Sequence, residues 1–361
     1  MAVAMTHEQL AQALLAAVRA QDFGATPDSR LGGKPLAHFP SIDLAVAAFP
    51  ANAQAVWANV LFSREAPSGV VAAMDAHAGA VTNLRFVADQ RNAQGESFLW
   101  WPDADWSAQT WTPLFGQGPH RFVAPYPASL LKMMVAVGVA MAVDARLTPW
   151  PEAAMQAMIT VSDNDATTEM VALLHRLRLV DSLHDRFKTC GLYTLRLDGT
   201  REDGGWGNGA GAGVGMIQMT AWDSARLMWL LDAEAPRAPW LAADAQLVST
   251  ASRERLRAWL EAQQLNEILS SSKLVGLPGW VSGLPSHLRF AHKTGTTENY
   301  ASDAGIVRAR PPLQRHYIVA LLTNLGTRYA PHADCATTWR LPALGAAVDT
   351  LLAPVLESLP S

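Results

Sequence analysis

Residues 129–143 read SLLKMMVAVGVAMAV, the most apolar run of the chain. Its apolar part, Leu130 to Val143, is shorter than the roughly 20 residues that a helix needs to span a bilayer. We therefore expect a buried helix and no membrane span. Ser129 and Lys132 stand at the start of this helix, and their spacing places both side chains on one helical face.

A serine hydroxyl beside a lysine amine can serve as a nucleophile. A neutral lysine accepts the hydroxyl proton, and burial or nearby cations lower the lysine pKa toward that role. The backbone N–H of Ser129, near a helix start, can stabilise an oxyanion. The spacing alone is weak evidence, because Ser270-Ser271-Ser272-Lys273 repeats it.

Two further motifs follow Ser129 in order. Ser162-Asp163-Asn164 comes after an expected helix over Ala153 to Ile159, and Lys293-Thr294-Gly295-Thr296 ends a strand-like run. Taken alone, the first is explained by helix capping and the second by a strand that ends in a turn. In this order, S-x-x-K, S-D-N and K-T-G form a known signature of class A β-lactamases and penicillin-binding proteins.

On these motifs the chain resembles the serine β-lactamase and penicillin-binding protein superfamily, and it is most similar to class A, from about Tyr126 onward. The resemblance implies that Ser129 attacks an amide or lactam carbonyl and becomes acylated. Lys132 would manage the proton of Ser129 and contact Asn164. Ser162 would pass a proton to the leaving nitrogen, with Lys293 nearby across the cleft.

The resemblance also implies a substrate-binding edge on the last motif. Thr294 would bind a substrate carboxylate, and the backbone N–H of Thr296 would complete the oxyanion hole with that of Ser129. Gly295 would permit close approach of the acyl group. The expected partner is thus a small-molecule or peptide-like substrate that carries a carboxylate.

One departure concerns release of the acyl group. Class A enzymes use a loop glutamate in an E-x-x-L-N pattern, which is absent here. Glu202 and Asp203 are the nearest carboxylates in the loop 198–215; either can act as the base, or both are simply solvated. Without a base, hydrolysis of a β-lactam stalls at the acyl-enzyme. A peptidase, esterase or acyltransferase on this scaffold is therefore the alternative, and a non-catalytic binding protein is a third reading.

The order of expected elements predicts an α/β (α+β) fold. An antiparallel sheet is built from N- and C-terminal segments, flanked by helices, with an inserted all-helical lobe. The expected parts are a helical extension over 1–65, a sheet lobe over 66–125 plus 270–361, and a helical lobe over 126–269 that carries the loop 198–215. The expected elements are helices over Met1 to Gln21, Leu44 to Phe62, Thr220 to Leu231, Ser252 to Leu269 and Leu341 to Leu359, a hairpin of Gly69 to Asp75 with Val81 to Ala88, and strands over Leu288 to Lys293, Ala304 to Val307 and Tyr317 to Thr323.

The tryptophans of one segment and the single residue His292 have ordinary structural explanations. The insertion 89–120 contains Trp100, Trp101, Trp106 and Trp111. Clustered aromatics of this kind anchor a segment more often than they form a substrate-facing wall. His292 precedes Lys293 in a strand, so its side chain is expected on the opposite face.

Composition excludes several classes of protein. The chain of 361 residues is 50% hydrophobic and 17% charged, with net charge −4 and no long Lys/Arg run, so we expect no nucleic-acid partner. Two cysteines, Cys190 and Cys335, are too few for a disulfide framework, and no spacing indicates a metal or cofactor. The start lacks signal-peptide features, which predicts a cytoplasmic protein, or a periplasmic one if the native start lies elsewhere.

Overall fold

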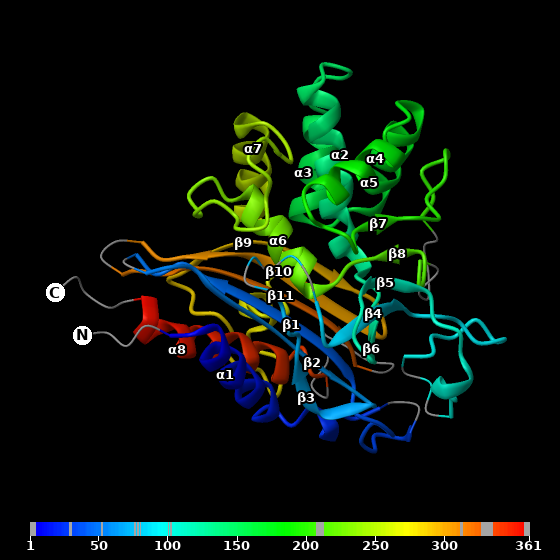
Figure 1. Cartoon of the computed structure of the whole chain (residues 1–361), viewed down its shortest axis with the longest axis vertical. Coiled ribbons are helices and arrows are strands. Elements are labelled where there is room, and N and C mark those ends of the chain that lie inside the picture. The colour runs from blue at the N-terminus through cyan, green and yellow to red at the C-terminus, as the bar shows by residue number, and fades with distance from the viewer. Residues whose placement is uncertain are drawn as a thin grey trace.

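A six-stranded antiparallel sheet forms the centre of the molecule (Figure 1). The structure, a computed structural model, describes residues 5–356 except 29–30, 52, 76, 78, 80, 100, 102, 207–212, 311–312 and 326–334. In sheet order the strands are β3 (Ala66–Val71), β2 (Val56–Ser63), β1 (Ser41–Ala48), β11 (His316–Asn324), β10 (Tyr300–Arg308) and β9 (Arg289–Thr296). Strands from both ends of the chain therefore meet at the β1–β11 pair.

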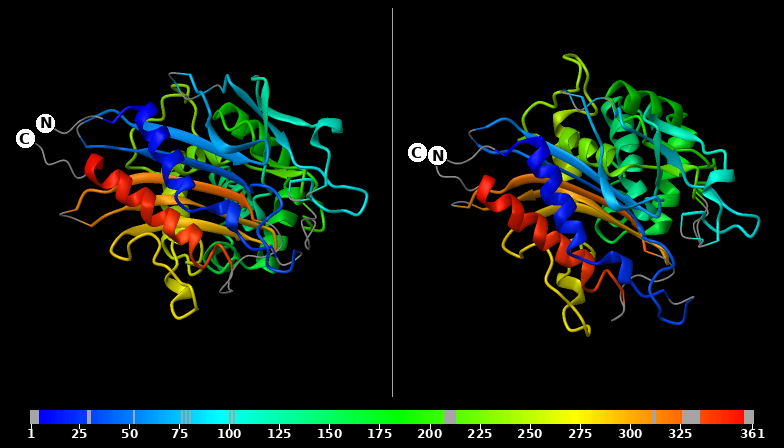
Figure 2. Two further views of the ribbon diagram at one scale, coloured as in Figure 1. Left: turned by 90° about the horizontal axis from the view of Figure 1, so that it is seen from below. Right: turned by 60° about the horizontal axis from the view of Figure 1, so that its bottom comes forward.

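Two helices cover one face of this sheet. Helix α1 (His7–Arg19) and helix α8 (Arg340–Leu356) lie side by side across it, as Figure 2 shows. Thr6 begins α1 with a capping box, and the buried face of α1 includes Leu10 and Leu14. Alternation along β1 matches this arrangement, since Leu44 packs on the α1–α8 side and Ala45 on the other.

A helical region covers the opposite face and rises above the sheet in Figure 1. Its helices are α2 (Lys132–Asp144), α3 (Glu152–Thr160), α4 (Asn164–Arg176), α5 (Val180–Thr189), α6 (Ala221–Leu231) and α7 (Thr250–Glu261). Helix α6 is buried along its whole length and packs on β1, β10 and β11. Helix α2 has almost no exposed residues because it lies inside the helical region, which explains why its sequence is apolar all round.

Smaller elements occupy other parts of the described chain. Strands β5 (Pro113–Gly116), β4 (Leu84–Ala88) and β6 (His120–Ala124) form a second sheet, and β7 (Arg196–Leu197) pairs with β8 (Ile217–Gln218). The short 3-10 helices are η1 (Phe23–Ala25), η3 (Trp106–Ala108), η4 (Ala128–Leu131) and η5 (Ser272–Leu274). Within the described residues, none of the helices is both long and apolar enough to cross a bilayer.

The predicted fold class is confirmed: N- and C-terminal strands share one antiparallel sheet that carries a helical insert. The helices predicted at the chain start, after Thr220 and at the end are confirmed as α1, α6 and α8, and the three late strands as β9, β10 and β11. The helix predicted over Ser252 to Leu269 ends at Glu261 instead.

The helix predicted over Leu44 to Phe62 is wrong. This stretch forms β1 and β2, two central strands of the main sheet, so residues 1–65 are not a purely helical extension. Both faces of β1 are buried, which gives a continuous apolar run without the alternation that marks a half-buried strand. The hairpin predicted over Gly69 to Asp75 and Val81 to Ala88 is wrong in its extent. Strands β3 and β4 belong to different sheets, and among the described residues the two runs share one antiparallel β-bridge, Met74–Val81.

Candidate active site

The Lys132 amine contacts both polar ends of the S-D-N motif. Its Nζ atom lies 2.5 Å from the Ser162 carbonyl oxygen, 3.1 Å from Ser162 Oγ and 2.8 Å from Asn164 Oδ1. Lys132 is fully buried in the first turn of α2, and Asn164 begins α4. The facing ends of two helices therefore bring these groups together.

A second lysine reaches the same hydroxyl. Lys293 Nζ donates to Ser162 Oγ at 2.9 Å and to the Thr294 carbonyl at 2.7 Å. Lys293 is also fully buried, on edge strand β9. Ser162 Oγ thus lies between two amines that come from α2 and β9, and a hydroxyl so placed can exchange a proton with either.

Burial changes the protonation of both lysines. Burial lowers the pKa of Lys132 to about 7, although the Asp163 carboxylate opposes the shift. Burial, followed by repulsion from the Lys132 charge, lowers the pKa of Lys293 well below its usual range. Near neutral pH, a substantial fraction of Lys132 is therefore the neutral amine that can act as a base.

Three oxygen atoms surround the Lys132 amine. The Ser162 carbonyl and Asn164 Oδ1 are acceptors, so together they occupy two N–H groups of Lys132. A neutral amine has two N–H groups and one lone pair. The third neighbour, Ser162 Oγ at 3.1 Å, either accepts the third N–H of an ammonium or donates its own proton to the lone pair of the neutral amine.

Two backbone positions at the site lie in the left-handed region. Ser162 has φ +60° and Ala128, directly before Ser129, has φ +50°. A non-glycine residue in this conformation costs roughly 1–2 kcal/mol, and such strain is typical of functional sites where surrounding contacts enforce it. Asp163 follows Ser162 and caps α4 by accepting from the Ala166 N–H at 2.7 Å. The capping explanation of the S-D-N motif therefore holds for its aspartate, while its serine and asparagine contact Lys132.

Strands β9 and β10 hold the segment that carries Ser129. Ser302 Oγ donates to the Pro127 carbonyl at 2.6 Å and contacts the Gly295 carbonyl at 3.2 Å. A Cβ atom built on Gly295 would lie 2.3 Å from the Pro127 carbonyl oxygen and 2.5 Å from the Leu130 nitrogen. Only glycine permits so close an approach, so Gly295 seats η4 on the strand. Ser129 itself is partly exposed, and no hydrogen bond joins its hydroxyl to Lys132 among the described contacts.

Gln263, which sequence reasoning missed, sets the spacing between the S-D-N loop and β9. Its amide donates to the Ile159 carbonyl at 2.8 Å and to the His292 carbonyl at 3.5 Å. The neighbouring Gln264 N–H donates to the Thr160 carbonyl at 2.9 Å. These contacts tie the end of α3 to the strand that carries Lys293.

The remaining residues of the third motif lie at the edge of the sheet. Thr294 is 2% exposed and opposes Asp303 in the β9–β10 ladder, whereas Thr296 is partly exposed at the strand end. The side chain predicted to bind a substrate carboxylate, Thr294, is therefore nearly covered, and that role stays a prediction. His292 binds Asp303 through Nδ1 at 2.7 Å, and alternation along the strand places it on the face opposite Lys293, as predicted.

The loop carboxylates make no described contact with the lysine pair. Glu202 is exposed, and Asp203 is 72% exposed with Arg201 at 3.4 Å. The hydrogen bond from the Gly205 N–H lowers the pKa of Asp203. No described hydrogen bond or ion pair connects either carboxylate to Ser129, Lys132 or Ser162. Residues 207–212 of the predicted loop lie outside the described residues.

The second serine–lysine motif serves structure. Ser271 Oγ donates to the Val281 carbonyl at 2.7 Å and accepts from the Gly283 N–H at 3.0 Å. Lys273 is half exposed and lies 3.6 Å from Glu267. This motif therefore closes a surface turn.

The tryptophans of the insertion anchor it, as the favoured interpretation predicts. Trp106 is 4% exposed, donates to the Phe98 carbonyl at 3.0 Å and lies under the Arg64 guanidinium. Trp111 donates to the Trp106 carbonyl at 3.1 Å, and Trp101 packs against the same core. Trp100 lies outside the described residues.

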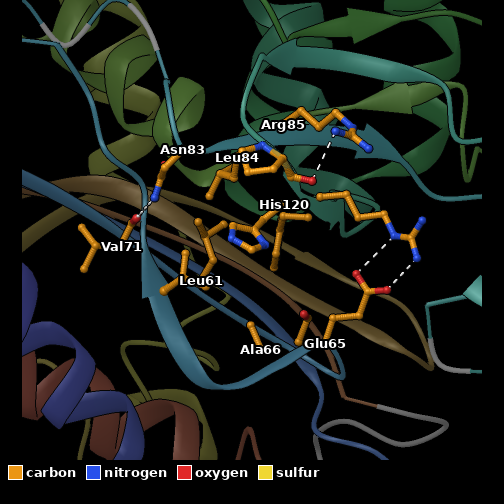
Figure 3. A pocket seen from close by; sticks show the side chains of 13 residues that line it. Leu61, Glu65, Ala66, Val71, Asn83, Leu84, Arg85 and His120 are labelled. Atoms are coloured by element: carbon orange, nitrogen blue, oxygen red, sulfur yellow. Dashed lines mark hydrogen bonds and ion pairs between the residues drawn. The ribbon is translucent and has the colours of Figure 1, made fainter. Parts of the chain in front are cut away.

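A separate cavity of about 620 Å³ lies between the two sheets (Figure 3). Glu65 and Arg121 pair at one end of it, and the Asn83 amide donates to the Val71 carbonyl at the other. Its floor is apolar, with Leu61 and other buried side chains. Ser129 and the two lysines do not line this cavity. Within the described residues, no group of three or more His, Cys, Asp or Glu side chains is placed to bind a metal.

Comparison with known proteins gives a consistent family. A family model described as the beta-lactamase enzyme family matches residues 141–338, which is more than half of the chain. This range contains the S-D-N and K-T-G motifs and begins after Ser129 and Lys132. No curated protein sequence matches the chain.

Solved structures share the fold at low identity. TLA-1, an extended-spectrum β-lactamase, is 12% identical with a TM-score of 0.55 and covers 95% of this chain and 99% of its own. A β-lactamase from Sphaerobacter thermophilus DSM 20745 is 16% identical with a TM-score of 0.52 over 97% of this chain and 99% of its own. A class A representative from Bacteroides cellulosilyticus DSM 14838 is 14% identical, with the same TM-score and coverage.

Proposed function

Since the chain belongs to the β-lactamase enzyme family, we propose that it is a serine hydrolase that forms an acyl-enzyme on Ser129. The substrate is a β-lactam or a related amide that carries a carboxylate. The observation that carries the proposal is the contact of Ser162 Oγ with both Lys132 and Lys293. Two buried amines around one hydroxyl form a proton relay, which a binding protein has no need to keep.

The proposed acylation begins at Lys132. With its pKa near 7, the neutral amine accepts the Ser129 proton as Oγ attacks the carbonyl carbon. The backbone N–H groups of Ser129 and Thr296 stabilise the oxyanion. Proton transfer to the leaving nitrogen comes from Ser162 Oγ, which takes a proton in turn from a neighbouring lysine. The C–N bond breaks, and the acyl group stays on Ser129.

A second candidate function is supported by the loop. Glu202 is exposed and Asp203 pairs with Arg201, and no described hydrogen bond or ion pair connects either carboxylate to Ser129. This favours a relative of the peptidase, esterase or acyltransferase kind. In such a relative a β-lactam acylates the protein, and the acyl group is released slowly. In a peptidase or esterase of this kind, water that this loop does not activate accepts the acyl group, and in an acyltransferase a second substrate nucleophile accepts it.

Intact mass spectrometry after incubation with a β-lactam panel tests the proposal. We expect a mass increase of one acyl group in the wild type and in Ser270→Ala, and none in Ser129→Ala. The matched Ser270→Ala variant removes the serine of the structural motif. A chromogenic cephalosporin then separates the two functions: sustained hydrolysis supports a β-lactamase, and a stoichiometric burst supports the relative. Labelling of Ser129→Ala to the wild-type extent would refute both.

A further inference from the structure

A buried hydrogen bond lies beside the segment that carries the proposed nucleophile. The Tyr300 hydroxyl donates to Asp89 Oδ2 at 3.0 Å. The two residues are 1% and 3% exposed and lie 211 positions apart. Asp89 directly follows β4, and Tyr300 begins β10 after the turn that leaves the K-T-G motif. The proposed chemistry does not use either residue.

Tyr300 reaches the chain that leads into Ser129. Its ring meets that of Tyr126 edge to face, with centroids 5.6 Å apart and planes at 79°. Ser302, two residues further along the same face of β10, holds the Pro127 carbonyl. One strand therefore fixes two successive residues, Tyr126 and Pro127, just before Ser129.

Asp89 is itself held tightly. Its carboxylate accepts from Ser97 Oγ, from the Leu99 N–H at 3.2 Å and from the Gln90 N–H at 2.8 Å, besides Tyr300. Burial raises the pKa of Asp89 to about 6, and the hydrogen bonds from Ser97 and Tyr300 oppose this shift. Above that pH the carboxylate is ionised, and a charge-assisted hydrogen bond to a buried phenol is stronger than a neutral one.

The carboxyl-terminal end of the loop 198–215 packs against Tyr126 and Asp89. A Cβ atom on Gly213 would lie 2.7 Å from Cε2 of Tyr126, and one on Gly215 would lie 2.6 Å from the Asp89 carbonyl oxygen. The loop therefore returns to the sheet in direct contact with Tyr126 and Asp89. Four segments of the chain meet here, and one of them, Tyr126 with Pro127, leads directly into Ser129.

We infer that Asp89 is a positioning residue for acylation, which fixes the Tyr300 ring and through it Tyr126 and the backbone that presents Ser129. The inference rests on the proposed function. It assigns no proton transfer to Asp89. Loss of the Asp89–Tyr300 bond should misplace Ser129 in the covalent step and leave initial substrate binding alone, because a small displacement of a reacting atom lowers the rate strongly.

A fluorophosphonate probe of Ser129 tests this inference through two constants, the maximal labelling rate and the probe concentration at half-maximal rate. Variants Asp89→Asn and Tyr300→Phe should each lower the maximal rate about tenfold, a change of about 1.4 kcal/mol in the barrier. The half-saturating concentration should stay within about twofold. The double variant should be no slower than the slower single variant, because both changes remove one interaction.

The chain offers a matched control pair. Tyr317 OH donates to Asp349 Oδ1 at 3.1 Å, buried on the face covered by α8. Tyr317→Phe and Asp349→Asn should lower the melting temperature and leave the maximal labelling rate unchanged. Equal rates in wild type, Asp89→Asn and Tyr300→Phe overturn the inference, and so does an equal loss in the control pair. If the probe does not label the wild type at all, the proposed function itself is wrong. The wild-type measurement therefore tests the proposed function separately from this inference.

Discussion

Lys293 Nζ lies 2.9 Å from Ser162 Oγ, although 131 positions separate the two residues in the chain. The contact joins the edge strand of the sheet to the loop between α3 and α4. This contact forms only when the helical region is packed against the sheet. The proposed chemistry therefore depends on the packing of both parts of the fold.

Removal of the Lys132 amine should abolish most of the acylation. Lys132→Ala deletes the proposed base, and general-base catalysis contributes about 10²–10⁴-fold to such a step. The rate of Ser129 labelling should fall by that factor, while Lys273→Ala, in the structural motif, stays within about twofold of wild type. Labelling of Lys132→Ala at the wild-type rate would show that another group accepts the proton.

The acylation rate should rise with pH through about 7. Lys132 acts in its neutral form, and its pKa is lowered to about 7, so the active fraction grows as the proton leaves and is complete above about pH 8. Rates of probe labelling from pH 5.5 to 9, corrected for the probe's own hydrolysis, measure the inflection. A rate that is still rising steeply at pH 9, as the ordinary lysine pKa of 10.5 would give, would contradict the proposed role.

Gly295→Ala should impair both stability and acylation. The added methyl group would meet the Pro127 carbonyl and the Leu130 nitrogen at 2.3 and 2.5 Å, and overpacking of this kind costs about 1–3 kcal/mol. Urea denaturation and Ser129 labelling measure the two effects. Gly24→Ala is the control, since its nearest contact would be an ordinary 3.5 Å to Phe39.

The stability of the protein should fall as pH rises from about 4 to 7 through Asp43. Burial raises the pKa of Asp43 to about 7, so the folded state holds a proton that the unfolded state releases above 3.8. Asp43 therefore contributes its full share to the free energy of unfolding below pH 3.8. This contribution, on the order of 4 kcal/mol, falls as the pH rises and is lost above about pH 7. Urea denaturation should show a flatter pH profile for Asp43→Asn than for wild type. The exposed change Asp103→Asn should leave the profile unaltered.

Loss of the Glu202 carboxylate should not change the lifetime of the acyl-enzyme. Glu202 is exposed and has no described contact with the lysine pair, so Glu202→Gln should release a bound penicillin within about twofold of the wild-type rate. Time-resolved intact mass measures the decay. A much longer lifetime in Glu202→Gln would identify it as the base that activates water.

The sequence predicted the parts of the site that depend on short motifs. The motifs pointed to Lys132, Ser162, Asn164 and Lys293, which the structure brings into contact, whereas the role of Ser129 stays a prediction. The sequence did not indicate Asp89, Gln263 or Tyr300, because their contacts join segments far apart in the chain, and no local pattern encodes such contacts. The prediction failed at β1 for a related reason, since burial on both faces removes the alternation that identifies a strand.

The pairing of β1 with β11 affects how the chain folds during its synthesis. Ser41 opposes Asn324 in this ladder, so the amino-terminal strands leave the ribosome long before their partner exists. Until β11 is synthesised, β1 presents an open edge with apolar side chains on both faces, a template for association with other nascent chains. Contacts of such long range also slow folding.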